Sequence, residues 1–324
     1  MQKVSQLIHA RWVCSMTPLR PQLEENQTLV IDNGSIIALG PTKTLTKQYH
    51  SEQVVTLPTH ILLPGFINAH AHSPMVLLRG LADDVTLNDW LNNAIWPAET
   101  ALVSESFIRD GMSLSIAEML RYGTTCINEH YFMPQVAAKI CDKMGMRARI
   151  GLWVGEVNLP WAPSTQKCFE VGLTCLKERK MSDYVSFSWA PHSPYLLNDT
   201  DLKHVATLSE KTQCPVHIHC HETDGEIKQS LAQFGVRPLE RLKAAGLLNE
   251  HIALVHMVET EPEELELLAH LGCHIVTCPK SNAKLASGYA PTFEMQQAGL
   301  NVALGTDSAA SNNNLDMLEE TKML

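Results

Sequence analysis

Several histidines and one aspartate of this chain stand at the ends of apolar runs, where they could converge on a metal ion. His70 and His72 end the first of these runs, and residues two apart in a strand point to the same side. His219, His256 and Asp307 end three later runs. Three histidines and one carboxylate that converge can hold one divalent cation and leave a coordination position for water. A single histidine at a strand end is usually an ordinary polar residue, so the prediction depends on the whole set.

The elements that must position these side chains follow a regular order. From residue 61 onward, short apolar runs alternate with longer helical stretches such as 104–123 and 262–272, which indicates parallel strands joined by helical crossovers. The eight runs are 61–72, 124–130, 147–154, 185–192, 216–221, 252–258, 274–279 and 301–308. This order predicts a (β/α)8 TIM barrel of the α/β class, whose catalytic groups lie at the carboxyl ends of the strands. An open doubly wound sheet is the weaker alternative, because no G-x-G-x-x-G follows any run.

The first 58 residues are instead typical of a small β element. Asn33-Gly34 predicts a β-hairpin, because these residues favour the positive φ angles of a tight turn. We expect two domains, a small β-sandwich portion over 1–58 and a metal-dependent barrel over 59–324. The N-terminal portion has too few strands for a stable sheet of its own, and only AASNNNLDMLEETKML follows the eighth run. We therefore expect an incomplete sandwich, with the last barrel helix and C-terminal strands missing from this chain.

Composition narrows the classes of partner. The 324 residues are 45% hydrophobic and 19% charged, which is enough for one large core. The net charge is −10 and lysines and arginines do not cluster, so we expect no nucleic-acid partner. No apolar run approaches the roughly 18 residues of a membrane span, and the nine scattered cysteines fit reduced thiols. We expect a cytoplasmic protein that does not bind membranes, and self-association into a homo-oligomer stays open.

Three segments carry a family resemblance: LLPGFINAHAHSPMVLLRG around the first run, HCHET after the fifth, and LGTDSAASNNNLDM after the eighth. They resemble the amidohydrolase superfamily, and within it the aminohydrolases of purines and triazines, particularly the 5'-methylthioadenosine/S-adenosylhomocysteine deaminases. The resemblance covers nearly the whole chain. It implies that His70, His72, His219 and Asp307 bind one Zn²⁺ per chain, with Fe²⁺ or Mn²⁺ as alternatives. It also implies that His256 lies near the metal-bound water.

The activity implied by the resemblance is hydrolytic deamination of an adenosine-type nucleoside, at a C–N bond of a cyclic amidine. A bound zinc ion lowers the pKa of its water from about 15.7 towards 7. Glu222 lies three residues after His219, in a loop that can reach the open metal position, and is the candidate general acid for the ring nitrogen. Asp307 or His256 would accept the proton of the attacking water. An isolated glutamate is more often a solvated loop residue, but its place after a metal ligand favours catalysis.

Contacts with the rest of the substrate follow from the same resemblance. Glu99 in IWPAE occupies a position that binds ribose hydroxyls in the resembled deaminases, and His192 occupies one that contacts the purine. Trp96 could line the pocket for the purine or its 5' tail. The ordinary alternatives are a core tryptophan for Trp96, a packed structural histidine for His192 and a surface glutamate for Glu99. The arginine that binds an amino-acid carboxylate in the family has no clear counterpart. A small nucleoside such as 5'-methylthioadenosine or 5'-deoxyadenosine is therefore favoured over S-adenosylhomocysteine.

Two other functions stay open at this point. The same metal site could serve a guanine or 8-oxoguanine deaminase, or a triazine chlorohydrolase. The chain could also be an inactive, truncated metal-binding scaffold. A zinc site of the cytidine-deaminase type is set aside because the chain has no P-C-x-x-C motif. A binuclear site is not expected, because the fourth run ends in His192 without the modified lysine of the binuclear members.

Overall fold

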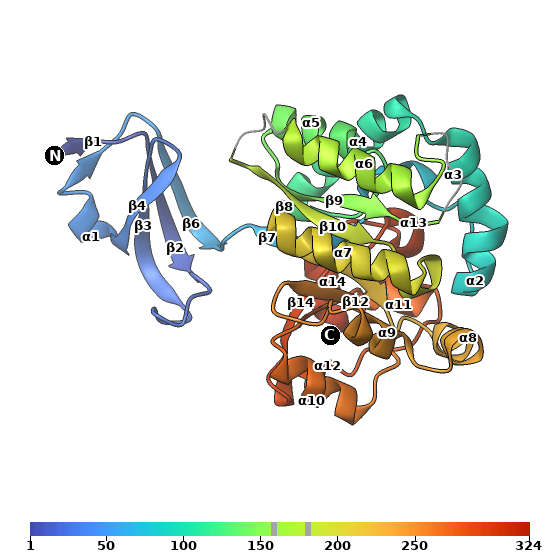
Figure 1. Cartoon of the computed structure of the whole chain (residues 1–324). Helices are drawn as coiled ribbons and strands as arrows, with labels where there is room; N and C mark the ends of the chain where they lie inside the picture. Colours follow the sequence, from blue (N-terminus) through green and yellow to red (C-terminus); the bar gives the residue numbers. More distant parts are fainter. Residues whose placement is uncertain (157–160, 179–182) are drawn as a thin grey trace. The chain divides into compact units, whose positions relative to one another are not determined.

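The chain folds into two compact units, Met1–Gly65 and Phe66–Leu324. The computed structural model in Figure 1 describes residues 1–156, 161–178 and 183–324. Each unit has its own sheet and its own apolar core. All of the candidate metal ligands belong to the second unit.

The N-terminal unit contains a four-stranded sheet in the order β4-β3-β2-β6. Its strands are β2 (Gln6–Val13), β3 (Glu24–Asp32), β4 (Ser35–Pro41) and β6 (Val54–Leu62). Asn33 and Gly34 join the antiparallel strands β3 and β4 with φ values of 47° and 75°, which confirms the predicted hairpin. The remaining elements are β1 (Gln2–Lys3), β5 (Tyr49–His50) and α1 (Thr42–Leu45). The side chains of Val4, Leu7, Val30 and Leu45 form the core of this unit.

The second unit is an eight-stranded parallel barrel, as predicted, and its strands follow one another in chain order. The strands are β7 (Phe66–Ala71), β8 (Thr124–Glu129), β9 (Arg147–Val154), β10 (Val185–Pro191), β11 (Val216–Cys220), β12 (Ile252–His256), β13 (His274–Thr277) and β14 (Asn301–Leu304). A parallel bridge between Ala71 and Asp307 joins the first strand to the segment after the last. The (β/α)8 architecture therefore places the carboxyl ends of all eight strands around one mouth.

The first barrel strand begins later than the sequence predicts. The run 61–72 is divided, because Ile61 and Leu62 still pair in β6 of the N-terminal sheet. Strand β7 starts only at Phe66. Pro64 lies between the two strands, and proline has no N–H to donate to a β-ladder. The histidines at the end of this run nevertheless keep their predicted place at the end of a barrel strand.

Helices connect the barrel strands and lie around the sheet (Figure 1). The longer ones are α4 (Glu105–Arg121), α5 (Pro134–Met144), α6 (Thr165–Lys177), α7 (Asp199–Thr212), α8 (Asp224–Phe234) and α10 (Pro262–His270). The shorter ones are η1 (Ser73–Leu78), α2 (Leu87–Trp90), η2 (Leu91–Ile95), α3 (Trp96–Leu102), η3 (Pro194–Leu196), α9 (Pro238–Ala244), α11 (Pro279–Lys284), α12 (Thr292–Gln297), α13 (Ala309–Asn312) and α14 (Met317–Met323). Local capping explains the ends of the predicted helices. The Ser104 hydroxyl accepts the N–H of Phe107 at the start of α4, and a capping box of Glu261 and Glu264 begins α10.

The barrel core lies mainly between the strands and their helices. Ile108, Met112 and Ile116 of α4 are fully buried there, and so is Trp189 of β10. This packing holds the strand ends rigidly, so that polar side chains at the mouth keep a defined geometry. Within the described ranges, no helix combines the length and the apolar character that a membrane crossing requires.

Candidate metal centre and active site

Four donor atoms from three parts of the chain meet at the carboxyl end of the barrel. They come from His70 on β7, His72 just after it, His219 on β11 and Asp307 after β14. The His219 Nε2 atom lies 3.2 Å from the Nε2 atoms of both His70 and His72. Asp307 Oδ1 lies 3.2 Å from His70 Nε2 and 3.1 Å from His72 Nε2. The structure therefore brings together the four residues expected to bind the metal.

The spacing of these atoms fits a divalent cation. With metal–ligand distances of about 2.0–2.1 Å, neighbouring donors of a tetrahedral site lie about 3.3 Å apart. Asp307 Oδ1 is buried and has no hydrogen-bond partner among the described residues. Burial lowers the pKa of His70 to about 3 and holds the pKa of His219 well below its usual value, so both imidazoles are neutral donors. A buried carboxylate oxygen facing nitrogen lone pairs needs a cation among them, and these residues fit that role.

Hydrogen bonds from the far side of each donor fix its orientation. The Nδ1–H of His72 donates to the main-chain carbonyl of His130, and that of His219 donates to the carbonyl of His192 at 2.6 Å. The second oxygen of Asp307, Oδ2, accepts the hydroxyls of two serines. They are Ser281, at 2.6 Å, and Ser311, at 2.8 Å. Outer partners of this kind orient metal ligands and raise metal affinity.

The backbone at the strand ends is unusual in the same region. His256 and Asp307 adopt positive φ values of 76° and 59°, which non-glycine residues rarely do. Gly305 precedes Asp307, and a Cβ atom at this glycine would lie 2.7 Å from the Cβ of His70. The close approach of the last strand to the first thus requires glycine, and it brings Asp307 to the histidines.

Glu222 and His256 stand beside the metal donors. Glu222 Oε2 lies 3.7 Å from His256 Nε2, and Glu222 Oε1 accepts the Ser287 hydroxyl at 3.4 Å. His256 Nδ1 is held at 2.8 Å from Asn282 Oδ1. Burial raises the pKa of Glu222, so this carboxyl group can carry a proton closer to neutral pH than an exposed one. A buried glutamate that retains a proton has the chemistry of a general acid.

A cleft opens at the carboxyl end of the barrel, beside the metal donors His72 and Asp307, and Glu99 on helix α3 lies in its wall. Its Oε1 atom accepts the Tyr131 hydroxyl at 2.6 Å, and both side chains are buried. Burial raises the pKa of Glu99 to about 7, while the tyrosine hydrogen bond opposes the rise. Tyr131 was not among the residues predicted from the sequence, although it lies two residues after the end of strand β8, in the region where functional residues of this fold are found.

His192 and Trp96 complete the predicted set, and both line this cleft. Burial lowers the pKa of His192 to about 3, so its ring is neutral. Aromatic and apolar side chains that the sequence analysis did not single out form much of the remaining wall: Met75, Leu87, Trp90, Leu91, Ile95, Tyr131, Phe132, Trp153, Tyr195, Leu196 and Leu285. No lysine or arginine occurs among the described residues that line the cleft. The cleft therefore suits a flat, largely uncharged molecule.

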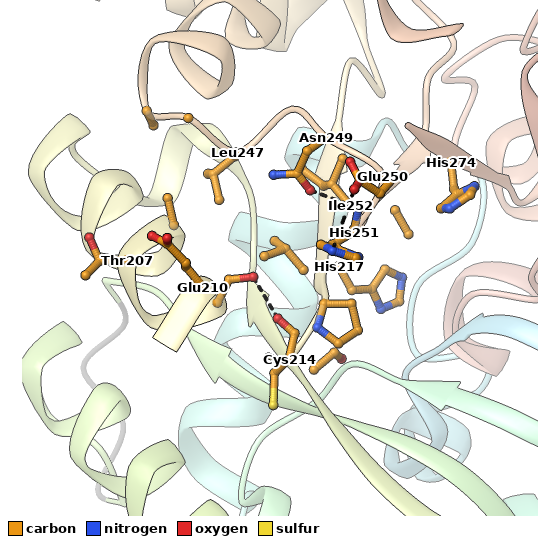
Figure 2. Close-up of a pocket in the computed structure, with 18 of the residues that line it drawn as sticks. Thr207, Glu210, Cys214, His217, Leu247, Asn249, Glu250, His251, Ile252 and His274 are labelled. Atoms are coloured by element: carbon orange, nitrogen blue, oxygen red, sulfur yellow. Dashed lines mark hydrogen bonds and ion pairs between the residues drawn. The ribbon is translucent and has the colours of Figure 1, made fainter. Parts of the chain in front are cut away.

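A second cleft, of about 970 Å³, opens at the other end of the strands. Figure 2 shows its wall around His217, Asn249, Glu250 and Ile252. Val216 and Ile252, the first residues of β11 and β12, line it and mark it as the amino-terminal end of the barrel. Its volume is considerable, but the convergent donors lie in the other cleft, and for a barrel of this kind the carboxyl ends of the strands are the site of chemistry.

Comparison with known proteins gives a consistent result. The model of the amidohydrolase family matches residues 61–324. The chain is 42% identical over 316 residues to a protein of Saccharophagus degradans named 5-methylthioadenosine/S-adenosylhomocysteine deaminase, which covers 97% of this chain and 70% of the relative.

Solved structures agree with this match. A crystal structure of an adenosine deaminase from Xanthomonas campestris with bound zinc has a TM-score of 0.96 at 40% identity, over 99% of this chain and 73% of the other. A guanine deaminase from C. acetobutylicum with bound guanine has a TM-score of 0.86 at 20% identity, over 98% of this chain and 78% of the other. At that identity, the second likeness concerns the fold alone.

Proposed function

The chain belongs to the amidohydrolase family, and from this premise we propose that it is a zinc-dependent hydrolase that deaminates an adenosine-type nucleoside. The products are the inosine analogue and ammonia. The observation that carries the proposal is the convergence of three imidazole nitrogens and one carboxylate oxygen beside a buried glutamate. The names of the similar proteins, a methylthioadenosine/S-adenosylhomocysteine deaminase and an adenosine deaminase with zinc, support the same reaction.

One zinc ion per chain is the proposed cofactor, held by His70, His72, His219 and Asp307. Three nitrogens and one oxygen are ligands that zinc accepts, and a catalytic zinc site keeps a further position open. Fe²⁺ and Mn²⁺ are the alternatives that the same donors can bind.

The proton transfers can be assigned to residues of the chain itself. A zinc ion in this site supplies Lewis-acid activation of water at neutral pH. Asp307 or His256 would accept a proton from the water as its oxygen adds to C6 of the adenine ring. Glu222 donates its proton to the neighbouring ring nitrogen, N1, so that no full negative charge develops on the ring. The proton taken up by Asp307 or His256 goes to the amino group, and the C–N bond breaks. The second proton of the attacking water restores Glu222, so nucleoside plus water becomes the 6-oxo product plus ammonia.

The remaining predicted residues would bind the nucleoside. Glu99 has one carboxylate oxygen engaged by Tyr131, and its other oxygen can accept from the ribose hydroxyls. His192 and Trp96 would contact the purine and its 5' substituent. Because no cationic side chain lines the described cleft, a carboxylate at the 5' end would lack a partner. We therefore place 5'-methylthioadenosine and 5'-deoxyadenosine ahead of S-adenosylhomocysteine.

A substrate panel tests this function. The zinc-loaded chain is mixed with 5'-methylthioadenosine, 5'-deoxyadenosine, S-adenosylhomocysteine, adenosine and guanine, and deamination is followed by ultraviolet absorbance and ammonia release. We expect the highest kcat/KM for the two nucleosides with small neutral tails. Preference for guanine would instead favour a base deaminase with the same metal site. Stoichiometric zinc without turnover of any aminopurine would contradict the proposed reaction.

The nine cysteines also bear on where the protein acts. All of them are free thiols, and most are buried. Reduced thiols are typical of the cytoplasm, which is the location that we propose.

A further inference from the structure

The three histidines of the metal centre are oriented in two different ways. His72 and His219 donate their Nδ1–H groups to main-chain carbonyls, which are present whatever side chain the accepting residue carries. His70 is different, because its Nδ1 atom lies 3.1 Å from the Nε2 atom of another side chain, His217. Of the three imidazoles, His70 is thus the one whose orientation depends on the identity of a second residue.

The position of His70 in the barrel explains this dependence. Its side chain is fully buried, and the last strand approaches so closely that a Cβ at Gly305 would lie 2.8 Å from the His70 carbonyl oxygen. His217 precedes His219 by two residues on β11, so both point into the barrel, with His217 deeper. Strands β7 and β11 are the first and fifth of the eight. The contact between the two histidines therefore crosses the barrel and joins the strands that carry the nitrogen donors.

The donor and acceptor roles in this contact follow from the metal site. His70 presents the Nε2 lone pair to the other donors, so its proton is on Nδ1 and is donated to His217 Nε2. His217 then carries its own proton on Nδ1. That atom is buried and has no hydrogen-bond partner among the described residues. His217 also belongs to the wall of the cleft at the amino-terminal end of the barrel, where Figure 2 labels it. It thus separates the metal centre from that cleft.

We propose that His217 is a positioning residue that sets the tautomer and ring orientation of His70 through a hydrogen bond across the barrel, and thereby raises the affinity for the metal. The inference rests on the metal site of the proposed function. His217 touches no reacting atom. It acts on the metal only through His70, as the main-chain carbonyls of His130 and His192 act through the other two histidines.

A second metal ion is the competing explanation of the same contact. Ligand atoms of His70, His130 and His217 lie within 4.8 Å of one another, and all three residues are buried. A cation there would need the Nδ1 atom of His70 without its proton, and this group of three contains no carboxylate to offset the added charge. Placing a second divalent charge in the barrel interior under these conditions is costly. The hydrogen bond between His70 Nδ1 and His217 Nε2 gives each of these two nitrogens a partner without this cost.

Metal affinity measurements on matched variants test the proposal. His217→Leu removes the acceptor, His217→Asn keeps a polar group that ends short of His70, and His217→Gln places an amide oxygen near the original nitrogen. His130→Leu tests the second-metal explanation, because it removes one imidazole of the group of three while the main-chain carbonyl that accepts from His72 remains. Each apoprotein is checked by circular dichroism. Zinc Kd is then measured by competition with a chelator, and the Co²⁺ form is examined by visible absorption.

We expect His217→Leu and His217→Asn to bind zinc roughly 10–100-fold more weakly than the original chain, with a changed Co²⁺ spectrum. His217→Gln should recover most of the affinity. If His217→Leu and His217→Asn bind zinc as tightly as the original chain, the proposal is overturned, and the same holds if His217→Gln recovers none of the lost affinity. Two zinc ions per chain, with the second lost in both leucine variants, would also overturn it in favour of a second metal site. An original chain that binds no zinc would instead contradict the proposed function itself.

Discussion

Glu222→Gln is the substitution that separates proton donation from metal binding. The amide has nearly the same shape as the carboxyl group and its oxygen can still accept the Ser287 hydroxyl, but it cannot donate a proton to the substrate ring. Glu222 does not belong to the group of metal donors, so zinc should be retained in full. The exchange replaces a buried ionisable group with a neutral one, so we expect no loss of folding stability.

The expected size of the effect follows from the cleft. Loss of a general acid lowers kcat by roughly 10²–10⁴-fold, or about 3–5 kcal/mol in the activation barrier. The other carboxyl groups among the described lining residues are Glu99 and Asp307. Tyr131 engages the first, and the second is a metal donor. Because neither can replace Glu222, we expect a loss in the upper half of that range, with little change in KM.

Glu226→Gln provides a matched control for this experiment. Glu226 is a second buried carboxyl group nearby, and its Oε2 atom accepts the backbone N–H of Glu222 at 2.8 Å. Burial raises the pKa of Glu226 to about 8, so the group is largely neutral at pH 7 already. Its glutamine variant should therefore keep most of the activity. If steady-state absorbance assays show that zinc-loaded Glu222→Gln retains a kcat close to the original, Glu222 is not the general acid.

Four other predictions concern substrate binding and the metal. Glu99→Ala should raise KM for nucleosides by about 10–100-fold, because a charged hydrogen bond contributes about 1.5–3 kcal/mol; an equal loss with a free aminopurine base would argue against a ribose contact. The pKa of Glu99 is about 7, and its ionised form is the better acceptor, so nucleoside KM should rise as pH falls through 7. Tyr131→Phe removes a hydrogen bond that lowers the pKa of Glu99, so the rise in KM should move to higher pH. An unchanged dependence of KM on pH would show that Glu99 does not control binding. Ser311→Ala removes one of the two hydroxyls that donate to Asp307 Oδ2 and should weaken zinc binding by roughly 10-fold, measured by competition with a chelator. An unaltered zinc affinity would show that this serine does not orient Asp307.

Much of the architecture could be predicted because it repeats along the chain. Each barrel strand is a short apolar run, and the eight runs identify the barrel without knowledge of any contact. The same logic places His219, His256 and Asp307 at strand ends that share one mouth. The first strand was placed less well, since nothing in the apolar pattern of 61–72 shows that its first residues pair in another sheet.

The supporting contacts of the site could not be predicted in this way. The hydrogen bond from Tyr131 to Glu99 joins residues 32 positions apart, and the contact of His70 with His217 joins residues 147 positions apart. Both depend on which side chains face each other across the closed barrel, and spacing along one strand carries no such information. For His192, the sequence predicted a side-chain contact with the purine. It carried no signal that the main-chain carbonyl of His192 orients His219.

X-ray absorption at the zinc edge, combined with metal analysis of the reconstituted chain, examines the proposed metal centre itself. We expect one zinc per chain, with three imidazole nitrogens and one carboxylate oxygen at about 2.0–2.2 Å. His219→Ala should lose one of the three imidazole contributions or the metal itself. A zinc environment without multiple imidazoles, or a spectrum unchanged in His219→Ala, would contradict the metal centre from which the proposed chemistry follows.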